Sequence, residues 1–148
     1  MALDDDIAIL RRVALFAPLS DEQLRLLAFG AEQHTISEGR ALCRAGQASD
    51  GAFVLKSGQL ALADEAGNET GVATQPGTLI GETALFHRGS WQVTAVAATA
   101  CTVFRLPRPL FRRILEEYPD TAEALFRQLA GDLSGQIAAF ERAAKRLG

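Results

Sequence analysis

The spacing of hydrophobic residues changes twice along the chain and divides it into three segments. Residues 1–33 and 108–148 have apolar side chains at helical spacing, whereas residues 34–107 alternate over short runs bounded by glycine or polar turns. This alternation fits strands that place one face on a core. We expect strands at His34–Ser37, Ala41–Arg44, Gly51–Lys56, Gln59–Asp64, Thr70–Thr74, Thr78–Ile80, Trp91–Ala97 and Cys101–Leu106.

Helix signals flank the predicted strands on both sides. We expect helices over Leu3–Val13, from Ser20 to near Gly30, over Leu110–Tyr118 and over Thr121–Leu147. Ser20, with Gln23 three residues later, forms a capping box that begins the second helix. Pro107 and Pro109 are expected to end the strand region before the third helix.

The last predicted helix has an apolar stripe at steps of three or four residues. Its members are Leu129, Leu133, Ile137, Phe140, Ala144 and Leu147. The stripe either packs on the strands of its own chain or forms the contact of a homodimer, which is the expectation that we favour.

Many short strands with regular turns predict a small antiparallel sandwich or barrel with jelly-roll character. The chain of 148 residues suits one domain, mainly β with flanking helices. We expect a double-stranded β-helix, that is, a jelly-roll-like β-roll over residues 34–107. A helical lead-in (1–33) precedes it and C-terminal helices (108–148) follow it.

Composition narrows the functional classes. The chain is 48% hydrophobic and 22% charged, with a net charge of -3, and this acidic balance disfavours direct DNA or RNA binding. Cys43 and Cys101 lack metal-ligand spacing, so buried free thiols in a reducing compartment are expected. Asp4-Asp5-Asp6 stands where a signal peptide needs positive charge, and no apolar run is long enough to span a bilayer. We therefore expect a cytoplasmic protein.

The segment 77–97 contains the candidate binding chemistry. A strand is expected to end before Gly81, and a short helical turn over Glu82–Phe86 is expected to follow it, with a polar loop at 87–90. The first amides of a helix lack internal partners and lie at its positive end, so an anion fits there. Gly81 lacks a Cβ and lets a ligand approach closely, and the Glu82 carboxylate can accept hydrogen bonds from hydroxyls. Together these features suggest a nucleotide.

This segment resembles the phosphate-binding cassette of the cyclic-nucleotide-binding domains, as in catabolite activator proteins and the regulatory subunits of cyclic-AMP-dependent kinase. That cassette runs Gly-Glu-x-Ala/Gly-Leu, a short loop, then Arg and a small residue leading into a strand. The matching positions are Gly81, Glu82, Ala84 and Leu85. The spacing of Gly39, Gly46 and Gly58 also resembles the corners of the family's β-roll, so the resemblance extends from about Leu10 onward.

The resemblance implies roles for the cassette residues. Glu82 would accept the ribose 2′-hydroxyl, the amides of Thr83 and Ala84 would face the cyclic phosphate, and the small Ala84 would leave the phosphate room. Val72 and Val93 would be apolar walls for the base. The expected ligand-binding residues are Gly81, Glu82, Thr83, Ala84, Leu85, Arg88, Trp91, Gln92, Val93 and Val72.

Trp91 stands where the family has the arginine that grips the cyclic phosphate. Loss of a charge-assisted contact of this kind costs roughly 1.5–3 kcal/mol, which corresponds to roughly ten- to hundredfold weaker binding. Two alternatives stay open. Arg88, three residues earlier, reaches the phosphate instead, or Trp91 stacks on a base or fills the pocket outright.

No catalytic or metal centre is expected. His34 and His87 are far apart in the sequence and do not make a clustered metal site. Ser90 near His87 on a loop is too little for nucleophilic catalysis. We therefore expect a module that is not an enzyme and requires no cofactor.

The resemblance implies a sensory module that binds a cyclic mononucleotide weakly, cyclic AMP over cyclic GMP, and signals through its C-terminal helices to a protein partner. The alternative is a degenerate member that serves as a dimerisation or protein-interaction module without nucleotide. The family's transcription factors place a helix-turn-helix domain after the last helix, whereas this sequence ends at Gly148. We therefore expect no direct DNA binding, no membrane contact, and a homodimer.

Overall fold

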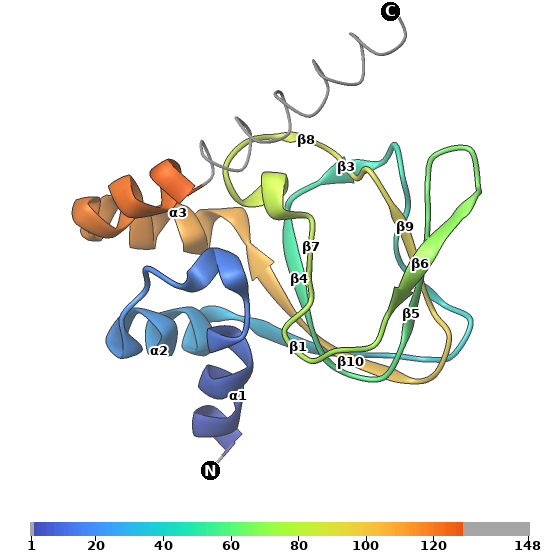
Figure 1. Cartoon of the computed structure of the whole chain (residues 1–148), viewed down its shortest axis with the longest axis horizontal. Helices are drawn as coiled ribbons and strands as arrows, with labels where there is room; N and C mark the ends of the chain where they lie inside the picture. Colours follow the sequence, from blue (N-terminus) through green and yellow to red (C-terminus); the bar gives the residue numbers. More distant parts are fainter. Residues whose placement is uncertain (1, 129–148) are drawn as a thin grey trace, which may run out of the picture.

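The computed structural model describes residues 2–128 and places them in a β-roll with helices at one end (Figure 1). One antiparallel sheet has the order β1 (Glu32–Ile36), β10 (Cys101–Pro107), β4 (Gly51–Ser57), β7 (Leu79–Ile80). The second has the order β2 (Ala41–Cys43), β9 (Thr94–Ala97), β5 (Leu60–Ala63), β6 (Glu69–Ala73). A short pair joins β3 (Ala48–Ser49) to β8 (Gly89–Ser90). The predicted architecture, mainly β with flanking helices, is confirmed.

Three helices and a helical segment cover the open end of the roll. They are α1 (Ala2–Arg11), α2 (Asp21–Gly30), α3 (Arg108–Glu117) and residues 119–128, with a 3-10 turn η1 (Ala14–Phe16) between the first two. The predicted capping box begins α2. The Gln23 amide donates to Ser20 Oγ over 3.2 Å, and the Ser20 amide donates to Gln23 Oε1 over 2.9 Å.

Two apolar clusters hold these parts together. The cluster at the helical end includes the fully buried Phe16, Phe111 and Leu125. The cluster inside the roll includes Leu55, Leu60, Ala95 and Trp91. The candidate cassette connects the two clusters, because Ile80 belongs to the second and Leu85 to the first.

The region before β9 differs from the prediction of one strand over Trp91–Ala97. The strand begins only at Thr94. Trp91 instead pairs with a distant loop. Its amide donates to the Gln47 carbonyl over 2.8 Å, and its carbonyl accepts the Gly46 amide over 2.8 Å. The β3–β8 pair was also missed, since two-residue strands have too few positions to show alternation.

The start of α3 also differs from the prediction. Pro107 is the last residue of β10, and the helix begins at Arg108, two residues before Leu110. Pro109 lies in the first helical turn. Proline is tolerated there because the amides of the first turn have no intrahelical acceptor. The sequence pattern therefore predicted the change from strand to helix, but it placed the start of the helix two residues too late.

The helical segment 119–128 is fixed against the lead-in helices. The Gln23 side chain donates to Thr121 Oγ1 over 2.9 Å, and the Gln128 side chain donates to the Ala14 carbonyl over 2.9 Å. The predicted stripe from Leu129 to Leu147 lies outside the described residues, and the homodimer stays a prediction. Within residues 2–128, no helix is long and apolar enough to cross a membrane.

Candidate functional site

Within the cassette segment 77–97, Gly81 comes directly after β7. Gly81 has φ +85°, in the left-handed region that favours glycine, and it precedes the 3-10 turn η2 (Glu82–Leu85). The Ala84 amide donates to the Gly81 carbonyl over 3.0 Å, and the Phe86 amide donates to the Thr83 carbonyl over 3.1 Å. The predicted turn is present. The Ala84 amide, expected to face a phosphate, is used inside the turn in this structure.

Trp91 lies in the interior of the roll, against the cassette. Its side chain is only 8% exposed and stacks on Phe53, with ring centroids 5.4 Å apart and planes at 24°. A Cβ added at Gly81 would lie 2.3 Å from indole atom Cζ3. The indole therefore occupies the space beside the Gly81 backbone, where the sequence predicts close approach of a ligand.

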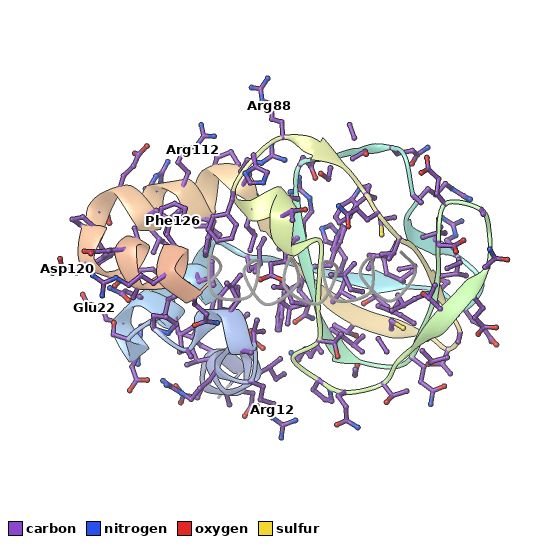
Figure 2. All side chains as sticks on the ribbon, turned by 45° about the horizontal axis from the view of Figure 1, so that its top comes forward. Arg12, Glu22, Arg88, Arg112, Asp120 and Phe126 are labelled. Atoms are coloured by element: carbon purple, nitrogen blue, oxygen red, sulfur yellow. The ribbon has the colours of Figure 1, made fainter. Side chains whose placement is uncertain are left out.

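The other predicted site residues differ in how deeply they are buried. Ala84 and Leu85 are buried, Glu82 and Val93 are partly buried, and Thr83, Arg88 and Gln92 are exposed. Figure 2 shows Arg88 pointing into solvent from the loop between η2 and β8. This orientation gives no support to Arg88 as a substitute for the missing arginine.

Val72 lies outside the interior in which Trp91 packs. Its side chain is 51% exposed, whereas the next residue, Ala73, is 7% exposed and belongs to the cluster inside the roll. Successive side chains of a strand point to opposite faces. Val72 therefore faces outward, which argues against its expected role as an apolar wall.

Arg108 was not singled out from the sequence, yet its guanidinium is hydrogen-bonded to the cassette. Its Nε donates to the Ala84 carbonyl over 2.6 Å, and its Nη2 donates to the Ser49 carbonyl over 2.7 Å. Only 9% of the residue is exposed. No sequence signal separates it from the exposed Arg112 and Arg113, because burial depends on where α3 docks.

An apolar contact joins the cassette to the C-terminal helices. The Phe86 ring meets Phe111 edge-on at 5.4 Å and lies 5.7 Å from Phe126. Phe126, labelled in Figure 2, is 51% exposed. It lines an open groove of about 550 Å³ together with Leu115, Pro119, Ala122, Glu123 and Arg127.

Both cysteines lie buried in the described part of the chain. Burial raises the pKa of the Cys43 thiol above its ordinary 9.0, against a smaller lowering by a backbone hydrogen bond with Ala95. A thiol of this kind stays protonated near neutral pH and is a poor nucleophile. Cys101 is also buried and free. Among residues 2–128, no three His, Cys, Asp or Glu side chains gather as a metal site.

The sequence and the fold are similar to those of known proteins. Residues 33–118, more than half of the chain, match the family described as "Cyclic nucleotide-binding domain". A cyclic-nucleotide-binding-like protein from Brucella abortus bv. 1 str. 9-941 is 42% identical, with a TM-score of 0.69 over 76% of this chain and 99% of that one. The N-terminal domain of a transcriptional regulator from Streptomyces coelicolor A3(2) is 32% identical, with a TM-score of 0.80 over 89% and 94%.

A curated relative leads to the same family. The cAMP-dependent protein kinase regulatory subunit of Eremothecium gossypii (strain ATCC 10895 / CBS 109.51 / FGSC 9923 / NRRL Y-1056) is 35% identical over 103 residues, which are 68% of this chain. The match spans only 22% of that subunit's length. The roll, the Gly81-Glu82 turn and these matches agree, and the chain belongs to the cyclic-nucleotide-binding domain family.

Proposed function

We propose that this chain is a regulatory interaction module in which Trp91 fills the nucleotide position of the cassette. The observation that carries the proposal is the indole stacked on Phe53 and placed against the Gly81 backbone. A ligand at that position has to displace a buried aromatic ring. Full burial of a large apolar side chain stabilises a protein by roughly 1.5–3 kcal/mol, and binding has to offset that amount.

The absence of an arginine at position 91 supports the same proposal. The family resemblance implies a guanidinium there, and neither Arg88 nor Arg108 replaces it. Arg88 is exposed. The Nε and Nη2 groups of Arg108 already donate hydrogen bonds to backbone carbonyls. The module therefore acts without a cyclic nucleotide at ordinary cellular concentrations.

A titration of the whole chain with cyclic AMP and cyclic GMP tests the proposal. Trp91 is the only tryptophan, so its emission reports on the cassette alone. We expect neither an emission change nor calorimetric heat up to about millimolar nucleotide, the weak end of the affinity scale. Trp91→Arg removes the indole and supplies the missing cation, so its cyclic AMP affinity should rise by about ten- to hundredfold.

The comparison between the two proteins decides the outcome. Circular-dichroism melting first establishes that Trp91→Arg is folded. Saturable binding of either nucleotide by the unchanged chain below about millimolar contradicts the proposal and favours the second candidate, a weak cyclic-nucleotide sensor. That candidate is favoured by the left-handed Gly81 followed by Glu82 at the start of η2. In that case Glu82→Ala should weaken binding and Arg88→Ala should leave it unchanged.

We further propose that the module acts as a homodimer through its C-terminal helices. Phe126 is 51% exposed in the groove beside α3, and the sequence beyond it continues with the apolar stripe from Leu129 to Leu147. A second copy docked at this groove would cover the exposed Phe126 side chain. Exposed apolar patches of this kind are frequent at interaction sites.

Sedimentation velocity tests the dimer. We expect a concentration-dependent dimer for the unchanged chain and weaker self-association for Phe126→Ser. Phe29→Ser is the matched control, because Phe29 is 80% exposed on α2 and its loss should leave the association unchanged. A monomer at high protein concentration contradicts the proposal, as does equal weakening by both substitutions.

A further inference from the structure

Arg108 stands at the junction of three segments. It is the first residue of α3, and its own amide donates to the Asp50 carbonyl over 2.9 Å. Its guanidinium donates to the Ala84 carbonyl over 2.6 Å and to the Ser49 carbonyl over 2.7 Å. The residue is only 9% exposed, so water has little access to these groups.

The two acceptors lie on the two sides of the cassette loop. Ala84 belongs to η2, which precedes the loop. Ser49 pairs with Gly89, which follows the loop, and its hydroxyl also donates to the Gly89 carbonyl over 3.1 Å. Arg108 thus contacts both ends of the loop from the start of α3, and Figure 1 shows β3 and β8 at the top of the roll, with α3 beside it.

Burial makes these contacts hard to break. A buried charged donor that loses its acceptor is not rehydrated, so the loss costs far more than at the surface. The rigid, planar guanidinium also fixes the direction of its hydrogen bonds. A displacement of η2 therefore has to be followed by Arg108 and by the first turn of α3.

Trp91 is connected through Gly81 to the contacts between η2, Arg108 and α3. The indole abuts the Gly81 backbone, and the Gly81 carbonyl accepts the amide of Ala84, whose own carbonyl accepts from Arg108. This chain of contacts runs without interruption from the interior of the roll to α3. A second route, the edge-on contact of Phe86 with Phe111, is apolar and less directional.

We propose that Arg108 is the positioning residue that couples the packing of Trp91 in the roll to the position of α3. The proposal rests on the proposed function, in which the buried indole defines the resting state of the cassette. A change at Trp91 shifts η2, and Arg108 transmits that shift to the first turn of α3. Arg108 touches no ligand in this account and acts only through the two carbonyls.

Hydrogen exchange of the full chain, read on peptides from α3, tests the coupling. Trp91→Phe keeps an aromatic ring but reduces its size, and we expect it to accelerate α3 exchange several-fold. Arg108→Lys keeps the cation but loses the planar fork, and we expect Trp91→Phe made in that background to change α3 exchange far less. A purely structural role predicts additive effects of the two substitutions.

Arg112→Lys is the matched control. Arg112 is on the same helix and exposed, and Figure 2 shows it pointing away from the cassette. Trp91→Phe should accelerate α3 exchange equally with or without Arg112→Lys. Unchanged α3 exchange in Trp91→Phe overturns the proposal, as does an undiminished effect in the Arg108→Lys background.

A second measurement needs no change at Arg108. The Arg108 Nε–H resonance should be protected from solvent exchange in the unchanged chain and should shift in Trp91→Phe. An identical Nε–H resonance in the two proteins overturns the coupling. Neither the hydrogen-exchange measurement nor the Nε–H measurement uses a nucleotide. Nucleotide binding by the unchanged chain would therefore contradict the proposed function but leave both measurements of the coupling unchanged.

Discussion

Gly81→Ala should lower the free energy of unfolding by about 2–5 kcal/mol. Two effects add at this position. The backbone has φ +85°, where a Cβ costs roughly 1–2 kcal/mol. The new methyl group would also lie 2.3 Å from the indole of Trp91, and overpacking of a filled core costs roughly 1–3 kcal/mol. Urea denaturation, followed by circular dichroism, measures the loss.

Gly67→Ala separates the two effects. Gly67 has φ +90°, close to that of Gly81, but no heavy atom lies within 4 Å of an added Cβ. It should therefore show the backbone cost alone, about 1–2 kcal/mol. Equal destabilisation by the two substitutions would contradict tight packing of Trp91 on Gly81. A further check is Trp91→Phe combined with Gly81→Ala, where a smaller ring should relieve part of the clash and make the effects non-additive.

Phe111→Ala should be the most destabilising single truncation at the helical end, with a loss of about 3–5 kcal/mol. Phe111 is fully buried and packs on Phe16, at 5.9 Å, and edge-on to Phe86, at 5.4 Å. Removal of the ring leaves a cavity between the lead-in, the cassette and α3. Thermal and urea unfolding of the purified variant measure the effect.

Phe29→Ala is the control for Phe111→Ala. The chemical change is the same, but Phe29 is 80% exposed at the end of α2. Surface substitutions away from special features usually change stability by less than about 0.5 kcal/mol. A Phe29→Ala loss as large as that of Phe111→Ala would show that the helical end is not organised around Phe111.

Much of the fold is readable in the sequence because its signals are local. Alternation in the segment 34–107 predicts the strands, and Ser20 with Gln23 predicts the start of α2 through a contact three residues long. The local sequence after Gly81 predicts a short helical turn, and the structure has the 3-10 turn η2 there. These features depend on neighbouring residues, so the sequence contains all that they require.

Strand boundaries were less accurate where distant segments decide them. The backbone amide and carbonyl of Trp91 form hydrogen bonds with the loop at 46–47, and β9 begins only at Thr94. The two-residue strands β3 and β8 form by pairing with each other. Partners forty or more residues apart in the sequence leave no periodicity, so the pattern of hydrophobic positions does not reveal them.

The sequence by itself determined the class of fold, the position of the cassette and the presence of tryptophan where the family resemblance implies arginine. It left open whether Trp91 fills the pocket or leaves it to Arg88. Only the tertiary structure decided that the indole is buried against Gly81, that Arg88 is exposed, and that Arg108 binds Ala84 and Ser49. The physical reason is that burial and hydrogen-bond partners depend on how β4, the cassette and α3 meet in space.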